Sequence, residues 1–228
     1  METVEHQGKS LTYLTVHPDN YRREASYPLI ILLHGFGANM RDLAGLTPAI
    51  DREGYVYACP NAPVALDVGP GMVGYGWGAI GDQGDPEEPR RIEEMLQTFF
   101  DEVMEQYQVS PGQAILGGFS QGAGMTYRCG LGRPDRFAGL FALSGSRADW
   151  DELKDRLPPQ RTQPIFIAHG AEDPVSPVER AMKAREFLEA EGYRPQYREY
   201  GMGHEITPEV MNDLVLWIRE VLPPLSSK

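Results

Sequence analysis

The sequence predicts one α/β domain over residues 1–228, with a mostly parallel central sheet and helices on both of its faces. Short apolar runs, typical of buried parallel strands, alternate with longer helix-like segments from Leu29 onward. Neither an internal repeat nor a linker-like stretch interrupts this alternation. Such a pattern favours a single sheet covered by helices. The short segment between Phe137 and Pro164 leaves no room for a large cap domain.

The expected strands differ in how they are patterned. The first alternates loosely, the following ones are continuous apolar runs, and the last is polar enough to form a sheet edge. The strand that precedes Ser120 lies at the centre of this series. The expected strands are residues 11–16, 29–33, 55–59, 114–116, 137–143, 164–168 and 196–200.

The expected helices lie between these strands. The clearest covers residues 90–107, where Ile92, Leu96, Phe99 and Val103 recur on one face with acidic residues opposite. The other expected helices are residues 39–54, a helix beginning at Ser120, residues 178–192 and residues 208–222.

One long segment, residues 68–89, has no periodicity, many glycines and an acidic end. An irregular segment of this length inside a compact domain is usually a functional or a mobile loop. Because Tyr75, Trp77 and Ile80 are embedded in it, we interpret it as part of the domain and not as a linker.

Composition excludes several classes of function. The chain has 33 acidic residues against 21 Lys and Arg, and a net charge of −12 makes nucleic acid an unfavourable partner. No apolar run approaches the ~20 residues of a membrane span, and the polar, acidic N-terminus does not resemble a signal peptide. Cys59 and Cys129 are expected to be buried free thiols. These features predict a cytoplasmic protein without stable membrane insertion.

The segment around Ser120 predicts the chemistry. An apolar strand leads into Gly118-x-Ser120-x-Gly122, and a small-residue, helix-compatible run follows. A nucleophile on a strained strand-to-helix turn requires glycine two residues before and two residues after it, because side chains there would clash. The helix that starts at the serine also directs backbone N–H groups toward an oxyanion formed beside it. By itself, however, Gly-x-Ser-x-Gly is also compatible with an ordinary glycine-rich loop.

Two further residues complete a catalytic set at the strand ends. Functional groups of a parallel sheet gather at the carboxyl ends of its strands, and Ser120, Asp173 and His204 each follow a predicted strand. A serine hydroxyl requires a histidine as general base, and that histidine requires a carboxylate to fix its tautomer. We therefore predict a catalytic triad of Ser120, Asp173 and His204.

Four other histidines compete for the role of base. His6 is expected in a polar N-terminal tail and His17 directly after the first strand, both at the surface. His34 precedes a glycine turn, where it is expected to hydrogen-bond its loop. His169, at a strand end before Gly170, is interpreted as structural. Only His204 follows the last strand in a Gly-x-Gly-His turn.

Other acids and serines are weaker candidates than the predicted triad. Glu172 adjoins Asp173, but the Pro-Val that follows makes Asp173 the better-placed acid. Asp149 and Asp151 lie in a loop after an earlier strand. Ser144 also ends a strand, but it lacks the glycine two residues before it, so we interpret it as a turn residue.

An oxyanion site needs two preorganised N–H donors. In an elbow of this kind, one is the residue after the nucleophile, here Gln121, and the other comes from the first strand-to-helix loop, here residues 34–37. Phe36 is the expected donor in that loop. The sequence contains no His-x-His, no carboxylate cluster and no Gly-x-Gly-x-x-Gly after a strand. We therefore expect neither a metal nor a cofactor.

Together these residues resemble the α/β-hydrolase superfamily and, within it, the phospholipase/carboxylesterase family that includes acyl-protein thioesterases. The matching segments follow one another along nearly the whole chain, and Gly-Phe-Ser-Gln-Gly is far more specific than the bare elbow pattern. They are residues 33–37, 60–63, 117–122, 133–137, 169–175 and 203–204. The resemblance implies a lidless serine hydrolase with Ser120, Asp173 and His204 as its triad.

The expected function is hydrolysis of short-to-medium acyl esters through an acyl-enzyme intermediate, with a small-molecule ester as substrate. A lysophospholipase or an acyl-protein thioesterase would use the same triad. A ligand-binding protein without catalysis would normally lack a triad residue, and a peptidase would normally carry an added selecting domain. The sequence leaves monomer and homodimer open.

The substrate cleft departs from the thioesterases at one point. Those proteins resemble one another in a Trp-Phe-Asp segment, whereas here Trp77 is followed by Gly78 and Ala79. This departure favours the simpler bacterial carboxylesterases. We expect Trp77 and Phe36 to line the cleft, with the alternative that Trp77 fastens the glycine-rich segment to the core.

Overall fold

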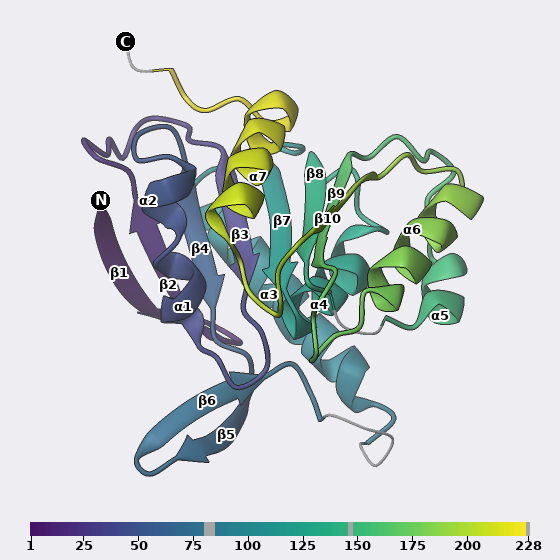
Figure 1. Cartoon of the computed structure of the whole chain (residues 1–228). Coiled ribbons are helices and arrows are strands. Elements are labelled where there is room, and N and C mark those ends of the chain that lie inside the picture. Colours follow the sequence, from purple (N-terminus) through teal and green to yellow (C-terminus); the bar gives the residue numbers. More distant parts are fainter. Residues whose placement is uncertain (80–84, 146–147, 227–228) are drawn as a thin grey trace.

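A computed structural model describes residues 1–79, 85–145 and 148–226. Its centre is an eight-stranded sheet in the order β1-β2-β4-β3-β7-β8-β9-β10 (Figure 1). The strands are β1 (Glu2–Gln7), β2 (Thr12–His17), β3 (Leu29–Leu33), β4 (Val56–Pro60), β7 (Ala114–Phe119), β8 (Gly139–Leu143), β9 (Ile165–Gly170) and β10 (Gln196–Tyr200). The pairs from β4 to β10 are parallel, and β1 and β2 are antiparallel to their neighbours. The expected mostly parallel sheet is therefore confirmed, with β10 at its edge.

Helices cover both faces of this sheet. On one face, Leu29, Ile31 and Leu33 pack in a core with α3 (Glu88–Gln106), α4 (Gln121–Gly130), α5 (Trp150–Lys154) and α6 (Glu179–Ala190). On the other, Ile30 and Leu32 pack with α1 (Met40–Ala44), α2 (Thr47–Ile50) and α7 (Pro208–Val221). Because successive strand residues point to opposite faces, a continuous apolar run supplies both cores.

Strand β1 is a feature that the sequence interpretation missed. Residues 2–7 are exposed or half-buried and largely polar, as an edge strand with one solvated side can be. Their backbone pairs antiparallel with β2 along its whole length. The segment expected to be a polar tail is therefore part of the sheet.

The single helix expected over residues 39–54 is two short helices. Helix α1 begins after Asn39, whose side chain accepts from the Arg41 N–H while Asp42 accepts from the Asn39 N–H. Helix α2 begins at Thr47, with Pro48 in its first turn. Proline is favoured there because its missing N–H is not needed in a first helical turn. The apolar spacing predicted the buried face but not this break.

The prediction of an irregular segment is wrong for its first part. Strands β5 (Val64–Gly69) and β6 (Met72–Gly76) form an antiparallel hairpin. Gly69 and Gly71 have positive φ angles of 143° and 73°, which permit the tight connection. Gly74 lies so close to the loop after β3 that a Cβ atom would be 2.1 Å from the Gly37 carbonyl oxygen. Residues 80–84, which include Ile80, lie outside the described residues.

Two expectations from composition can be compared with the structure. Cys59 and Cys129 are free and buried as expected, and burial raises the pKa of both thiols, which keeps them protonated. Over the described ranges, no helix combines the length and the apolar character needed to cross a membrane.

Candidate active site

Ser120 occupies a strained turn between β7 and α4. Its φ and ψ angles are 53° and −117°, a conformation that non-glycine residues rarely adopt. The Ser120 N–H donates to the Leu143 carbonyl at 2.9 Å, which ties the turn to the neighbouring strand β8. The side chain is half-buried. This geometry exposes the hydroxyl at the carboxyl end of the sheet.

The two glycines of the elbow are required by close backbone contacts. A Cβ atom on Gly118 would lie 2.3 Å from the Gly122 carbonyl carbon. A Cβ atom on Gly122 would lie 2.0 Å from the Leu33 carbonyl oxygen. Both contacts are with backbone atoms, which cannot turn aside as a flexible side chain can.

We expect Gly118→Ala to destabilise the protein by about 1–3 kcal/mol or more, because the new methyl group overlaps the backbone of α4. Thermal unfolding measures the effect. Gly132→Ala is the matched control, since a Cβ atom there would lie 3.5 Å from the nearest atom, the Arg156 carbonyl oxygen. An equal loss of stability in both variants would contradict this account of the elbow.

A continuous hydrogen-bond chain connects three of the predicted residues. His204 Nδ1 lies 2.7 Å from Asp173 Oδ2, and His204 Nε2 lies 3.0 Å from Ser120 Oγ. Because a carboxylate only accepts, Nδ1 carries the proton and Nε2 is free to accept from the serine hydroxyl. The Phe119 ring lies 4.8 Å from the imidazole, between centroids, and limits its movement.

Asp173 is held in place by backbone donors. Its Oδ1 accepts from the N–H groups of Val175 at 2.9 Å and Ser176 at 2.8 Å, leaving Oδ2 for His204. Burial raises the pKa of Asp173, but the hydrogen bonds from Ser176, His204 and Val175 outweigh it and hold the pKa below its usual range. The ionised form therefore adds stability at and above the pKa of an unfolded aspartate, and this stability is lost as the pH falls through the folded-state pKa.

Hydrogen bonds from the side chains of His169 and Ser176 hold the loop that carries Asp173 in place. His169 is fully buried, and its Nε2–H donates to the Ser176 carbonyl at 2.7 Å. The same nitrogen lies 3.5 Å from Asp173 Oδ2. The Ser176 hydroxyl donates to the Gly145 carbonyl at 2.7 Å. Sequence reasoning missed Ser176, although an aspartate commonly closes a turn by accepting from the backbone two residues on, as Asp173 does from the Val175 N–H.

The remaining histidines make other contacts. His34 Nδ1–H donates to the Gly35 carbonyl at 2.7 Å, and its Nε2 accepts from the Ala62 N–H at 3.0 Å. Burial lowers the pKa of His34, so it stays neutral while it braces its loop. His6 and His17 were expected at the surface but are half-buried in β1 and β2, where each contacts a hydroxyl group of a neighbouring element.

The two predicted oxyanion donors lie on segments that meet at Ser120. The loop of residues 34–37 passes so close that a Cβ atom on Gly35 would be 3.2 Å from Ser120 Cβ. The backbone N–H groups of Phe36 and Gln121 donate to no other residue within the described part of the chain. Gln121 is the first residue of α4, where helical N–H groups have no partner inside the helix.

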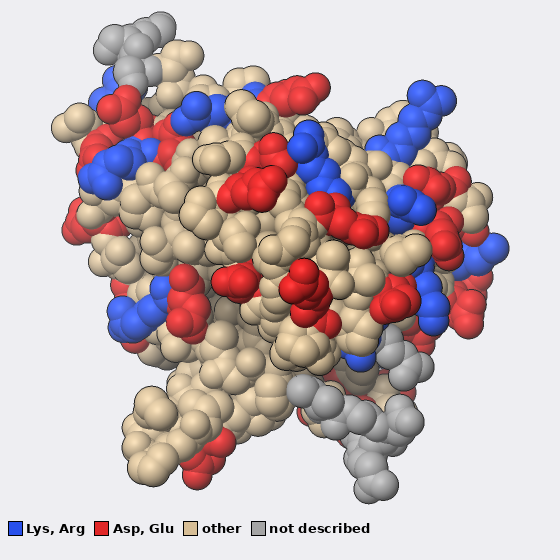
Figure 2. Space-filling view, in the orientation of Figure 1, with Lys and Arg blue, Asp and Glu red and all other residues tan. Residues whose placement is uncertain are grey.

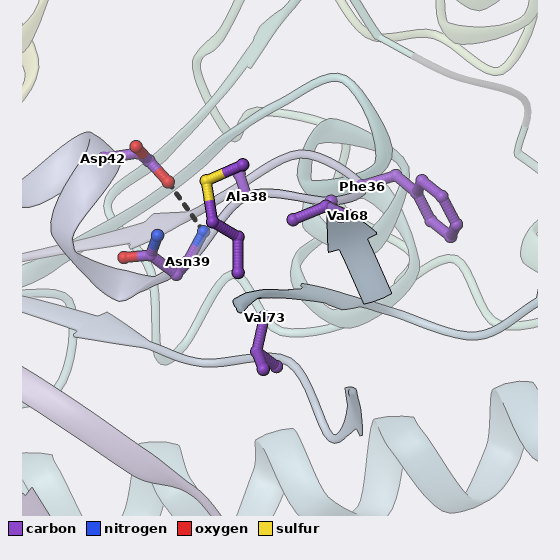
Figure 3. A pocket seen from close by; sticks show the side chains of 8 residues that line it. Phe36, Ala38, Asn39, Asp42, Val68 and Val73 are labelled. Carbon is purple, nitrogen blue, oxygen red and sulfur yellow. Dashed lines mark hydrogen bonds between the residues drawn. The ribbon is translucent and has the colours of Figure 1, made fainter. Parts of the chain in front are cut away.

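An open hollow of about 560 Å³ adjoins this loop (Figure 3). It lies between the start of α1 and the β5–β6 hairpin, and three exposed apolar side chains of the hairpin line it together with Phe36. These three are Val68, Met72 and Val73. Figure 2 shows the hairpin as an arm that projects from the body and carries few charged side chains. Phe36 is 42 % exposed, so its ring is available to a bound molecule.

Trp77 and Gln121 make contacts that the sequence interpretation did not foresee. The indole of Trp77 is 5 % exposed, and its N–H donates to the His34 carbonyl at 2.9 Å. The Gln121 side chain accepts from the Trp77 N–H at 2.7 Å and donates to the Gly78 carbonyl at 3.1 Å. Of the two roles considered for Trp77, lining the cleft or fastening the glycine-rich segment to the core, its burial and hydrogen bonds agree with the second.

The arrangement has the parts that acyl transfer requires. It combines a hydroxyl nucleophile, an imidazole nitrogen within hydrogen-bond distance of it, a carboxylate that orients the imidazole, and nearby free N–H groups. Within residues 1–79, 85–145 and 148–226, no group of three or more His, Cys, Asp or Glu side chains could hold a metal ion.

Comparison with known proteins identifies the family. Residues 20–222 match the sequence profile described as Phospholipase/Carboxylesterase. The chain belongs to the phospholipase/carboxylesterase family. As a member of this family it is a serine hydrolase that acts on ester bonds, and the predicted resemblance is confirmed.

Two curated relatives of this family member share the name acyl-protein thioesterase 1. The chain is 30 % identical to acyl-protein thioesterase 1 of Kluyveromyces lactis over 214 residues, covering 85 % of this chain and 92 % of the relative. It is 30 % identical to acyl-protein thioesterase 1 of Gibberella zeae over 213 residues, covering 86 % and 91 %.

Solved structures confirm the α/β-hydrolase fold of this phospholipase/carboxylesterase family member. Esterase PE8 matches with a TM-score of 0.75 and 27 % identity, covering 91 % of this chain and 97 % of the other. The Bacillus cereus carboxylesterase matches with a TM-score of 0.74 and 19 % identity, covering 94 % and 96 %, which supports the fold alone.

Proposed function

We propose that this protein is a serine carboxylesterase that hydrolyses short-to-medium acyl esters. In this proposal Ser120 is the nucleophile, His204 the general base, and Asp173 the carboxylate that orients it. The backbone N–H groups of Phe36 and Gln121 receive the oxyanion. The observation that supports it best is the hydrogen-bond chain from Asp173 Oδ2 through His204 to Ser120 Oγ.

The first half of the reaction forms an acyl-enzyme. Ser120 Oγ attacks the ester carbonyl carbon while its proton passes to His204 Nε2. The carbonyl oxygen becomes an oxyanion, and the Phe36 and Gln121 N–H groups stabilise it. The bond to the alcohol oxygen then breaks, and His204 gives its proton to the departing alcohol.

The second half releases the acid. Water gives a proton to His204 Nε2 and attacks the acyl carbon, so that a second tetrahedral intermediate forms at the same N–H groups. The bond to Ser120 Oγ breaks, and the proton on His204 returns to the serine oxygen. Asp173 stays ionised throughout and stabilises the imidazolium formed in each half.

The chain-length preference is tested with p-nitrophenyl esters from acetate to palmitate. We expect kcat/KM to be highest for short-to-medium chains, because the hollow beside Phe36 is open and has only the start of α1 on one side and one hairpin on the other. Each buried CH₂ group contributes about 0.8 kcal/mol, so a rising trend should stop where the acyl chain outgrows its contacts. A rate that rises steadily to palmitate would contradict this substrate range and favour a lysophospholipase.

An acyl-protein thioesterase is the second candidate function. The relatives from Kluyveromyces lactis and Gibberella zeae are both named acyl-protein thioesterase 1, and their similarity to this chain favours that function. The same triad would attack a thioester carbonyl, with a thiol in place of the alcohol as leaving group. Matched octanoyl oxygen ester and octanoyl thioester substrates separate the two functions by their ratio of kcat/KM.

The organisation and location of the protein stay predictions from the sequence. We propose that residues 1–228 form one α/β-hydrolase domain. We also expect a cytoplasmic protein that acts on small-molecule esters as a monomer or homodimer.

A further inference from the structure

The two proposed oxyanion donors belong to parts of the chain that are far apart in sequence. Phe36 lies in the loop after β3, and Gln121 begins α4. One short stretch, residues 75–78, hydrogen-bonds to both of these parts. We call this stretch the bridging segment; it consists of the end of β6 and the two residues that follow it.

The bridging segment is attached to the Phe36 loop on both sides of Phe36. On one side, the Trp77 indole N–H donates to the His34 carbonyl at 2.9 Å. On the other, the Gly37 N–H donates to the Tyr75 carbonyl at 2.9 Å, and the Tyr75 N–H donates to the Ala38 carbonyl at 2.8 Å. These bonds restrain the peptide that carries the Phe36 N–H from both directions.

Close packing adds to these hydrogen bonds. A Cβ atom on Gly76 would lie 2.9 Å from Phe36 Cδ2, so the absence of a side chain lets the segment lie directly against the Phe36 ring. Gly74 meets the Gly37 carbonyl in the same way. The spacing of these glycines therefore fits a segment that must approach another backbone closely.

The bridging segment is attached to the nucleophile elbow by one side chain. Gln121 Oε1 accepts from the Trp77 N–H at 2.7 Å, and Gln121 Nε2 donates to the Gly78 carbonyl at 3.1 Å. The residue whose backbone N–H is the second proposed donor thus also holds the segment that restrains the first. Both groups of the amide are used, which fixes its orientation.

We propose that the side chains of Trp77 and Gln121 are positioning residues that set the distance between the Phe36 and Gln121 N–H groups. This inference rests on the proposed function, because it assigns a role only if those groups receive an oxyanion. Neither side chain needs to touch the substrate. An oxyanion site stabilises the transition state only when its donors already point at the developing charge.

Two conservative variants test the proposal. Gln121→Met keeps the backbone N–H and a side chain of similar length but loses both amide bonds, and Trp77→Phe keeps a buried ring but loses the bond to His34. We expect each to lower kcat about 10-fold while KM stays within about 2-fold, since small misplacements of catalytic groups cost up to about 10²-fold. Inhibition by an alkyl boronic acid, which becomes tetrahedral when Ser120 Oγ adds to its boron, should weaken by the same factor.

Two control variants separate positioning from a general loss of stability. Gln163→Met removes a buried glutamine whose side chain donates to the Phe137 carbonyl at 2.9 Å, and Trp217→Phe alters a tryptophan of α7 that is also 5 % exposed. We expect comparable losses in melting temperature for test and control variants, but wild-type kcat and boronic acid inhibition only in the controls.

The outcomes also distinguish this proposal from the proposed function. If Ser120→Ala is inactive while the two test variants keep the kcat of their controls, the positioning role is wrong and the proposed function stands. If kcat falls but inhibition by the boronic acid is unchanged, the positioning role is again contradicted. If Ser120→Ala itself retains activity, the proposed function fails first.

Discussion

Replacing Ser120 with alanine should lower kcat for p-nitrophenyl butyrate on the order of 10⁶-fold, because the hydroxyl that we propose forms the acyl-enzyme is lost. The hydroxyl is the group that lies 3.0 Å from His204 Nε2, and alanine removes it without adding bulk. Alanine keeps a Cβ atom, so the backbone strain at φ 53° is unchanged. We therefore expect the melting temperature to stay close to that of the wild type.

Ser144→Ala is the matched control for this variant. Ser144 also follows a strand of the sheet, has a φ angle of 46° and is fully buried. Its hydroxyl has no hydrogen-bond partner in the part of the chain that the structure describes. Activity should therefore survive in Ser144→Ala. Turnover in Ser120→Ala near the wild-type level would remove Ser120 from the mechanism, whatever the behaviour of the control.

Much of the candidate site could be predicted because its signals are local in sequence. The Gly-x-Ser-x-Gly spacing reflects a steric requirement within five residues, and the structure places Gly118 and Gly122 in contact with backbone atoms as that requirement demands. The sheet brings the ends of β7, β9 and β10 to one edge, so Ser120, Asp173 and His204 could be grouped from topology alone.

What the sequence could not predict depends on contacts between distant segments. Strand β1 is polar and pairs only at the sheet edge, so its own residues carry no strong pattern. The β5–β6 hairpin could not be predicted because its sequence is rich in glycine, which normally weakens a strand. Here the glycines permit a close approach to the loop after β3. The Gln121 side chain could have been suspected from Gly-Phe-Ser-Gln-Gly, but its partners, Trp77 and Gly78, lie about 40 residues away in sequence.

Replacing Asp173 with asparagine should lower kcat/KM by about 10⁴-fold, because the amide can present an N–H group to His204 and favour the wrong tautomer. Asparagine can keep its oxygen on the Val175 and Ser176 N–H groups, which leaves its NH₂ group facing His204. The imidazole would then carry its proton on Nε2 and could not accept from Ser120. Steady-state kinetics with p-nitrophenyl butyrate measure the loss.

The dependence of stability on pH tests the hydrogen bonds of Asp173, including the one to His204, in a second way. Hydrogen bonds from Ser176, His204 and Val175 outweigh its burial and hold the pKa of Asp173 below its usual range. In the wild type, the free energy of unfolding should therefore fall as the pH drops through the folded-state pKa of Asp173. In Asp173→Asn this acid-dependent loss should be smaller, because asparagine does not ionise, and chemical denaturation at several pH values measures it.

Glu172→Gln separates this specific contact from the general effect of removing a negative charge. Glu172 is the neighbour of Asp173 in sequence, but it is exposed, and within the described residues it forms no hydrogen bond or ion pair with His204. Removing its charge should change kcat/KM by less than about 5-fold, because exposed charges are screened by solvent. If Glu172→Gln lowered kcat/KM as far as Asp173→Asn does, the loss would report the local charge and not the Asp173–His204 hydrogen bond. A large loss of kcat/KM in Asp173→Asn alone would tie the base to the carboxylate 2.7 Å from its ring.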